Sequence, residues 1–166
     1  MINILSIVQD AQNNLYDTCD LKIKDFNSEL ESLEYYAHVY YVKSKSVRFR
    51  IAKKTPKKVG WFVTLWKRVG ETIAPYDASD SIDIVASTIL DRKKIGQFIF
   101  PKEILLQKKI LSVNNKGGKR AIRVYSPWDK VVSLQAIKSQ KWQEKYFVNL
   151  DLKNIHDIEK VKKLYR

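Results

Sequence analysis

The stretch from Lys43 to Arg68 reads KSKSVRFRIAKKTPKKVGWFVTLWKR, and its pattern predicts β-strands. It holds ten basic residues and no acidic one, with aromatic residues spaced among them. Val47, Phe49 and Ile51 alternate with Arg48, Arg50 and Ala52, which is the two-residue period of a β-strand. Thr55-Pro56 and Gly60 interrupt the pattern, because proline and glycine break strands. Charge of one sign at this density is typical of a surface that meets a polyanion.

Strand patterns continue on both sides of the alternating segment. The Tyr-rich run from Tyr36 to Val42 has a β-type composition, so it is predicted to form a hairpin with the strand that starts at Val47. After the Thr-Pro turn, Trp61 to Lys67 is apolar on both faces and therefore reads as a central strand. Three further short strands are predicted, over Ile82–Thr88, Ile95–Phe100 and Ala121–Tyr125.

Four segments have the features of helices. Near the N-terminus apolar side chains recur about every four residues, and an Asp- and Asn-rich turn region follows that helix. Pro101 suits the first turn of a second helix, because its fixed φ matches the helix and its missing N–H needs no partner there. The four predicted helices cover about Ile2–Asp17, Pro101–Lys109, Leu134–Tyr146 and Ile155–Leu164.

These elements favour one domain over residues 1–166, because a chain of 166 residues is the size of a single globular core. The order of the elements predicts the α+β class, with a mostly antiparallel, mixed sheet that is flanked by helices. A restriction-endonuclease-like arrangement is one form of this class that the order allows.

Composition narrows the classes of protein. The single Cys19 excludes an internal disulfide and a zinc knuckle, which fits a reducing compartment. The N-terminus lacks the basic leader of a signal peptide, and no apolar run reaches the roughly 18 residues of a membrane span. We therefore predict a cytoplasmic protein without a membrane partner, and the sequence points to no cofactor.

The net charge of +13 is unevenly distributed along the chain. Met1–Glu34 carries seven acidic residues and two lysines, whereas Lys116–Lys145 carries eight basic residues and two acidic ones. Such asymmetry is typical of proteins that bind nucleic acid, an anionic membrane or an acidic protein. A solvated lysine-rich surface is the alternative. Because the cations fall on predicted strands rather than on an amphipathic helix, nucleic acid is favoured over membrane.

Arg48 and Arg50 are the first candidates for phosphate contacts. Side chains two apart on a strand share a face, so the two guanidinium groups would lie about 7 Å apart, which approximates the spacing of phosphates. Arginine binds phosphate with two parallel donors. Arg123, on its own predicted strand, extends the same face. Each arginine could instead pair with an acid of the chain, and the candidates are Glu34, Asp83 and Asp129.

Lysine-rich loops and tryptophans complete the predicted surface. Four lysines surround the Thr-Pro turn, and a Gly-Gly turn presents two more cations with its backbone N–H groups. Tryptophan beside cations is a common way to stack unpaired bases, although core packing is the default for aromatic residues. The predicted nucleic-acid-binding residues are Arg48, Arg50, Lys53, Lys54, Lys57, Lys58, Lys67, Arg68, Lys119, Arg120, Arg123, Trp66, Trp128 and Trp142.

Several of these segments carry a family resemblance. The strings that resemble the MepB family are EYYA from Glu34, FRIAKKTPKKVGWFVTLWKR from Phe49, GQFIFP from Gly96, GKRAIRVYSPW from Gly118 and QKWQEKYF from Gln140. The resemblance spans about Glu34 to Phe147. It implies a bacterial, cytosolic protein with one MepB-like domain and a poorly defined biochemical role, so nucleic-acid binding is predicted from the charge alone.

An enzymatic function finds little support among the residues present. The only histidines, His38 and His156, are far apart in sequence and lack metal-ligand spacing. The strongest enzymatic alternative is a metal-dependent nuclease with Glu34 and Asp83 as its acids, but Gln97 stands where a second carboxylate is needed. We predict no catalytic residue and no metal site. The choice between DNA and RNA, and formation of a homodimer, stay open.

Overall fold

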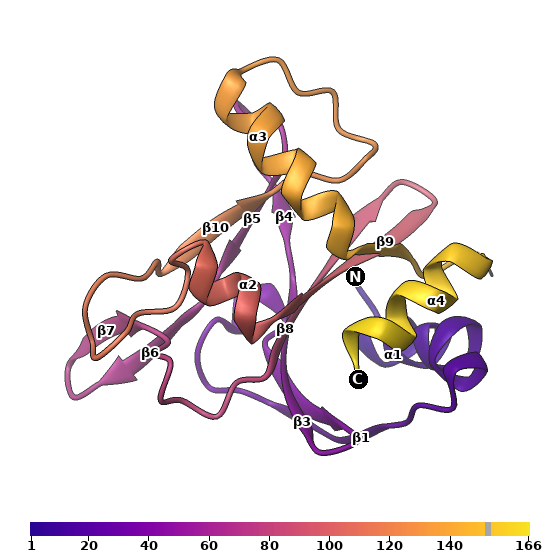
Figure 1. Ribbon diagram of the computed structural model, residues 1–166, viewed down its shortest axis with the longest axis horizontal. Coiled ribbons are helices and arrows are strands. Elements are labelled where there is room, and N and C mark those ends of the chain that lie inside the picture. Colours follow the sequence, from indigo (N-terminus) through magenta and orange to yellow (C-terminus); the bar gives the residue numbers. More distant parts are fainter. Residues whose placement is uncertain (152–153) are drawn as a thin grey trace.

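The computed structural model describes residues 1–151 and 154–166, and its strands form three sheets (Figure 1). The largest has the strand order β1-β2-β3-β8-β9-β11, a smaller one has the order β10-β5-β4, and β6 and β7 form a separate pair. The strands are β1 (Ile23–Ser28), β2 (His38–Val42), β3 (Lys45–Ile51), β4 (Lys53–Lys54), β5 (Trp61–Thr64), β6 (Trp66–Val69), β7 (Thr72–Pro75), β8 (Ile84–Asp91), β9 (Lys94–Pro101), β10 (Ala121–Val124) and β11 (Phe147–Asn149).

The helices lie near their predicted positions. They are α1 (Ile4–Ala11), α2 (Lys102–Gln107), α3 (Leu134–Gln143) and α4 (Ile155–Leu164), with short helical turns η1 (Gln12–Tyr16), η2 (Asp17–Cys19), η3 (Leu33–Tyr35) and η4 (Glu144–Tyr146). Three helices begin at capping side chains, because Asn3, Ser133 and Asn154 each accept a hydrogen bond from a backbone N–H of the first turn. None of the helices in the described ranges combines the length and apolar character that crossing a membrane requires.

The large sheet is covered on both faces. Helices α1 and α4 pack on one face, where Leu15, Phe49 and Ile99 are fully buried (Figure 1). The small sheet, α2 and part of α3 cover the other face and bury side chains such as Val63 and Phe98. Two apolar cores therefore lie on opposite sides of one sheet, and a strand in its middle has no face in contact with solvent.

The predicted fold class is confirmed. Strands β3 and β8 run parallel, and the other paired strands of the described residues run antiparallel, so the sheet is mixed but mostly antiparallel. The predicted hairpin is also present, as β2 and β3 with register Tyr40 opposite Val47. The restriction-endonuclease-like arrangement stays a prediction.

Several segments differ from their predicted structure, among them β7, which was not predicted and pairs with β6. The region after the first helix, predicted as a turn, is β1, an edge strand with an irregular register between Lys24 and Asn27. Such a polar edge strand lacks the apolar alternation that marks a strand. The predicted strand Trp61–Lys67 is two strands, β5 and β6, which belong to different sheets. Strand β11 has only three residues, too few to show a period.

Buried tyrosines fasten the C-terminal helix to the sheet. The Tyr16 hydroxyl lies 2.8 Å from that of Tyr165 and donates to Gln97 Oε1 at 3.0 Å. Burial raises the pKa of Tyr165 well above its ordinary value. Gln97 itself donates to Thr88 Oγ1 at 2.9 Å. The amide that occupies the expected place of a nuclease carboxylate thus joins β9 to β8 and, through Tyr16, to Tyr165 at the end of α4.

Candidate functional site

The prediction that Arg48 and Arg50 form a solvent-exposed face is wrong. The Arg50 side chain is 0% exposed and that of Arg48 is 21% exposed, and both form ion pairs with Glu29. Arg50 also donates to the Thr64 carbonyl at 3.2 Å, which belongs to the small sheet. The small sheet is a second layer over this face of β3, so strand alternation alone could not show which face meets solvent. Arg50 is unavailable to a ligand.

The cations of β6 lie on the separate β6–β7 hairpin and form ion pairs with acidic residues of the chain. Lys67 pairs with Asp80 at 2.7 Å, and Arg68 pairs with Glu31 at 3.3 Å. The Arg68 guanidinium also lies over the Trp66 ring, 5.6 Å from its centroid. These three predicted site residues therefore have partners within the chain. Exposed pairs such as Arg68–Glu31 still open easily, because they are worth only about 0.2–1 kcal/mol.

Arg123 lies on a different sheet from Arg48 and Arg50, so it does not extend their face. It stands on β10, in register with Phe62 of β5, and Phe62 is in turn in register with Lys53 of β4. Its guanidinium donates to Thr55 Oγ1 at 3.0 Å and to the Val59 carbonyl at 3.4 Å. In the described part of the chain these partners are neutral, so the positive charge of Arg123 is not compensated by a carboxylate.

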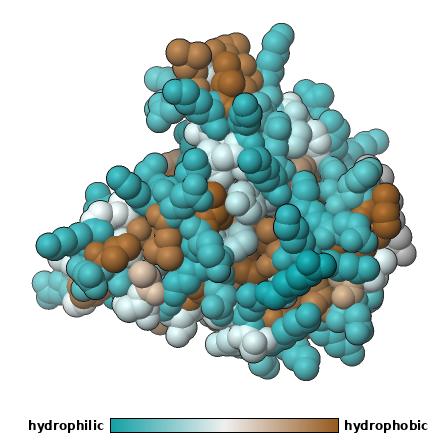
Figure 2. Space-filling model, in the orientation of Figure 1, coloured by the Kyte–Doolittle hydropathy of each residue, from teal (hydrophilic) through white to brown (hydrophobic). Residues whose placement is uncertain are grey.

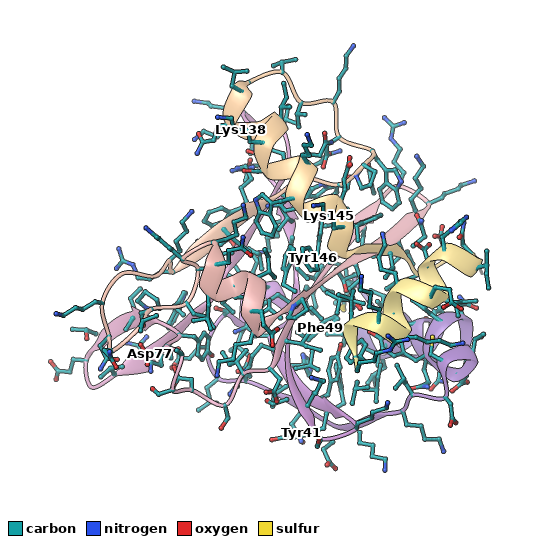
Figure 3. The ribbon with its side chains drawn as sticks, viewed as in Figure 1. Tyr41, Phe49, Asp77, Lys138, Lys145 and Tyr146 are labelled. Carbon is teal, nitrogen blue, oxygen red and sulfur yellow. The ribbon has the colours of Figure 1, made fainter. Side chains whose placement is uncertain are left out.

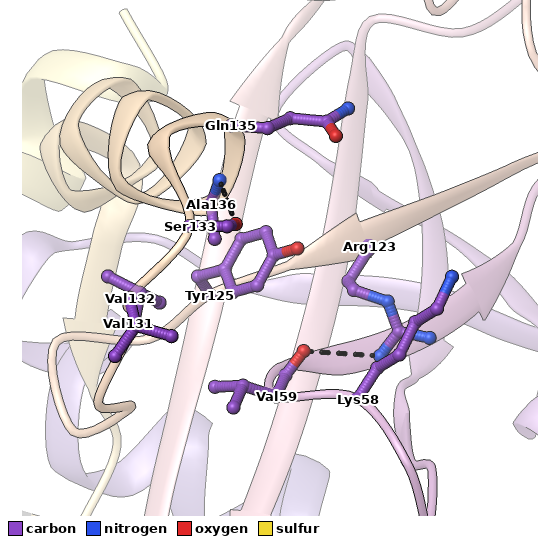
Figure 4. Close-up of a pocket in the computed structure, with 9 residues that line it drawn as sticks. All are labelled: Lys58, Val59, Arg123, Tyr125, Val131, Val132, Ser133, Gln135 and Ala136. Carbon is purple, nitrogen blue, oxygen red and sulfur yellow. Dashed lines mark hydrogen bonds between the residues drawn. The ribbon is translucent and has the colours of Figure 1, made fainter.

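Three adjoining hollows meet at Arg123, and we call them together the Arg123 groove. Their volumes are about 410, 300 and 190 Å³, and Arg123 lines all three. Figure 4 shows the largest, between the first turn of α3 and the segment that carries Lys58 and Val59. No carboxylate is among the described lining residues of the groove. Its cations are Lys57, Lys58, Lys108, Lys119 and Arg123.

Helix α3 forms one wall of the groove and is held to β10 by glutamine side chains. Gln143 accepts a hydrogen bond from the Tyr125 N–H at 2.7 Å and donates to the Arg123 carbonyl at 3.1 Å. Gln140 donates to the carbonyls of Ser126 and Asp129 at 2.8 and 2.9 Å. These amides satisfy backbone groups beside the edge strand of the small sheet. The groove therefore has fixed walls before any ligand arrives.

The tryptophans of the predicted site are half-buried. Trp142 lines the smallest hollow, packs on Phe100 with ring centroids 5.4 Å apart, and has the Lys108 ammonium 5.3 Å from its ring. Trp128 packs edge-on against Phe147 at 5.2 Å. Trp128 and Trp142 thus each pack against the core and also line a surface hollow.

A second basic hollow of about 550 Å³ lies beside Trp128, at the turn between β8 and β9. Its cations are Lys54, Arg92, Lys93 and Lys94. Lys54 pairs with Asp91 at 3.4 Å, and the Lys94 ammonium lies 5.2 Å from the Trp128 ring. The last three cations were missed in the sequence, although the string DRKK between two predicted strands is a basic turn.

The two cations that follow the Gly117-Gly118 turn lie in different surroundings. Lys119 lines the Arg123 groove, whereas Arg120 is exposed outside it. Asp77, which lies beside the β6–β7 hairpin (Figure 3), fixes the loop that leads to this turn. Its carboxylate accepts hydrogen bonds from Ser112 Oγ at 2.7 Å and from the Asn115 N–H at 2.9 Å. Hydrogen bonds from Ser79, Asn115 and Ser112 hold the pKa of Asp77 well below its usual range.

Glu34 and Asp83, the two acids considered for a nuclease, do not line the same hollow. Glu34 is exposed on η3. Asp83 and Glu103 line a hollow of about 320 Å³ together with Lys45 and Lys102. One carboxylate oxygen of Asp83 already accepts the Ser46 N–H at 2.8 Å. Within residues 1–151 and 154–166, no group of three His, Cys, Asp or Glu side chains is placed to hold a metal ion.

Comparison with known proteins gives one family and one solved structure. The family model described as MepB-like matches residues 29–149. A solved structure, the crystal structure of MepB, is 32% identical to this chain and superimposes with a TM-score of 0.76. The match covers 90% of this chain and 97% of the other. None of the curated proteins matches. The family match includes the Arg123 groove and the buried Glu29 ion pairs.

Proposed function

This chain belongs to the MepB-like family, and we propose that it binds nucleic acid through phosphate contacts in the Arg123 groove. The observation that carries the proposal is the composition of the groove, which has five cations and no carboxylate among its described lining residues. A phosphate backbone is a polyanion that would match such a surface over several contacts.

The positions of the cations support phosphate contacts. Arg123 is half-buried, and Thr55 and Val59 hold its guanidinium in place, so little side-chain freedom is lost when it binds an anion. Lys57, Lys58 and Lys119 are exposed around it. The net charge of +13 would also steer a polyanion toward the chain from a distance.

The first test is the salt dependence of binding, measured by fluorescence anisotropy with labelled random oligonucleotides. If the five groove cations each neutralise one phosphate, we expect log Kd against log salt to have a slope of magnitude about 3.5 on single strands. The slope follows from the release of condensed counterions. Binding that is insensitive to salt would contradict the proposal.

An acidic protein is the alternative occupant of the groove. Exposed apolar side chains lie at the start of α3, namely Val132, Leu134 and Ile137, and Figure 2 shows an apolar patch there in an otherwise mostly hydrophilic view. Polyglutamate serves as the competitor in the anisotropy assay. At equal charge concentration, polyglutamate should displace the oligonucleotide far less well than unlabelled nucleic acid does, because it has carboxylates in place of phosphates and carries no bases. Equal displacement would favour the protein partner.

A metal-dependent nuclease is the rival function, and the shared hollow of Asp83 and Glu103 is the observation in its favour. We expect no cleavage of plasmid or single-stranded DNA with Mg²⁺ or Mn²⁺, because one Asp83 oxygen is already bonded and no third metal ligand joins the pair in the described residues. Gel electrophoresis measures the products. Cleavage that disappears in Asp83→Ala would establish the nuclease instead.

A further inference from the structure

The largest hollow of the Arg123 groove is bounded by an aromatic ring, two cations and a helix. Its volume is about 410 Å³, within the range of roughly 300–1,000 Å³ that holds drug-sized ligands. Figure 4 shows the Tyr125 ring in the middle of the lining, with Lys58 and Arg123 together on the side toward which its hydroxyl points. The amide of Gln135 lies above them on α3. The lining thus combines a flat apolar surface with cations at one end.

One contact positions the Tyr125 ring, and another holds the backbone that carries it. Gly60 has a φ of +91°, and a Cβ atom at that position would lie 2.8 Å from two carbons of the ring, so the ring packs directly on the glycine. The backbone N–H of Tyr125 donates to Gln143 Oε1 at 2.7 Å. A ring that packs on Gly60, on a backbone held by Gln143, is a prepared stacking surface, because little freedom is lost when a base is placed on it.

We propose that this hollow takes one unpaired nucleotide, with its base stacked on Tyr125 and its phosphate bound by Lys58 and Arg123. The chain then prefers single-stranded nucleic acid to duplex. This inference rests on the proposed function and narrows it to a substrate class. Aromatic side chains beside a cationic groove are the general means by which proteins hold single strands, since every base has a flat π-face.

The preference follows from what each ligand must do to enter. A single strand can place a nucleotide between α3 and Lys58 without breaking any base pair. A duplex must first unpair and unstack one nucleotide, which weakens binding by about tenfold or more. A duplex that stays paired reaches only the exposed cations at the rim, such as Lys57 and Lys119. Duplex binding should therefore be weaker and independent of Tyr125.

The test compares a labelled 16-nucleotide dT strand with a 16-base-pair duplex at one salt concentration. We expect the single strand to bind about tenfold more tightly or better. Tyr125→Leu should weaken single-strand binding by about fivefold to a hundredfold, the usual value of one stacked base. The matched control Tyr125→Phe keeps the ring and should stay within about twofold of wild type. Neither variant should alter duplex binding.

A change in the ligand removes the concern that Tyr125→Leu is poorly folded. A 16-unit abasic strand keeps every phosphate and lacks the bases, so wild-type protein should bind it more weakly than dT by about the same factor that Tyr125→Leu costs. Tyr125→Leu should bind both strands equally. Equal or tighter duplex binding, or equal affinities of the Leu and Phe variants for dT, would overturn the inference and leave phosphate binding intact. Loss of salt dependence for every ligand would instead overturn the proposed function and this inference with it.

Discussion

Glu29→Ala is expected to lower the free energy of unfolding by about 3–5 kcal/mol, the usual effect of removing one partner from a buried ion pair. Glu29 is 10% exposed and pairs with both Arg48 and Arg50, while its Oε1 lies 3.5 Å from the Tyr76 hydroxyl. Without the carboxylate, the guanidinium groups of Arg48 and Arg50 lose their shared counter-charge. A loss of about 3–5 kcal/mol is a large part of the free energy of unfolding of an ordinary domain, which is about 5–15 kcal/mol.

The surroundings of the ion pairs explain why the loss is not recovered by rearrangement. Among the described residues, Arg48 Nε and Arg50 Nη2 are buried and have no hydrogen-bond partner. The remaining bonds of Arg50 go to the carbonyls of Thr64 and Phe49, which are neutral. Because Arg50 is enclosed between the two sheets, its charge cannot turn toward water when Glu29 is absent.

Urea denaturation followed by tryptophan fluorescence measures this loss. Glu31→Ala is the matched control, because Glu31 pairs with the half-exposed Arg68 and should cost less than about 1 kcal/mol. Arg50→Met should cost less than Glu29→Ala, since the Glu29–Arg48 pair survives and the apolar chain fills the site. A Glu29→Ala protein that is as stable as Glu31→Ala would show that the buried pairs contribute little.

The same contacts decide how substitutions in β3 are to be interpreted. Reversing the charge of Arg50 would place two carboxylates in one buried site, so a loss of ligand binding in Arg50→Glu would report unfolding rather than a lost phosphate contact. Charge reversal tests an interface only at side chains that reach solvent. Lys57, Lys58 and Lys119 are exposed and meet that condition, and the half-buried Arg123 meets it because it lines the groove.

Local pattern was enough to predict much of the fold. The alternation after Val47 and the preceding Tyr-rich run predicted the β2–β3 hairpin, and apolar spacing placed α4 at Ile155–Leu164, as observed. Two of the strands that were missed depend on distant partners. Strand β1 is polar and exists because it pairs with β2, and β11 consists of three residues that pair with β9. Neither carries a periodic signal of its own.

The site was predicted less well because exposure is a tertiary property. The shared face of the two arginines on β3 followed correctly from strand period, but the layer that covers Arg50 includes Thr64 of β5, which is 14 residues away in the sequence. A signal was present in Trp61–Thr64, whose apolar character on both faces required a neighbouring layer. Arg123 and the lysines of the Thr-Pro loop were predicted individually. Arg123 and these lysines come together beside α3 only because β10 pairs with β5 in the observed register.

The double variant Lys58→Glu, Arg123→Glu is expected to weaken single-strand binding on the order of 100-fold at 0.1 M salt. Two phosphate contacts are lost with their counterion release, and two carboxylates then repel the same backbone. The slope of log Kd against log salt should fall in magnitude by about 1.4, which is the share of two single-strand contacts. Both side chains line the same hollow, so their effects are expected to be coupled rather than additive.

The matched control is Lys22→Glu, Lys24→Glu, which removes the same amount of positive charge from exposed side chains at β1. If binding depended only on the net charge of +13, both double variants would lose affinity equally. If phosphates bind in the groove, the β1 variant should keep its salt slope and lose no more than about threefold in affinity at this ionic strength, because charges beyond a Debye length are largely screened. The single variant Lys58→Glu controls for misfolding, because Lys58 is exposed and its side chain makes no hydrogen bond within the described residues. Its loss of single-strand affinity should be smaller than that of the double variant but in the same direction. Equal losses in the groove and β1 variants would mean that charge acts at long range only, and the Arg123 groove would then have no special role.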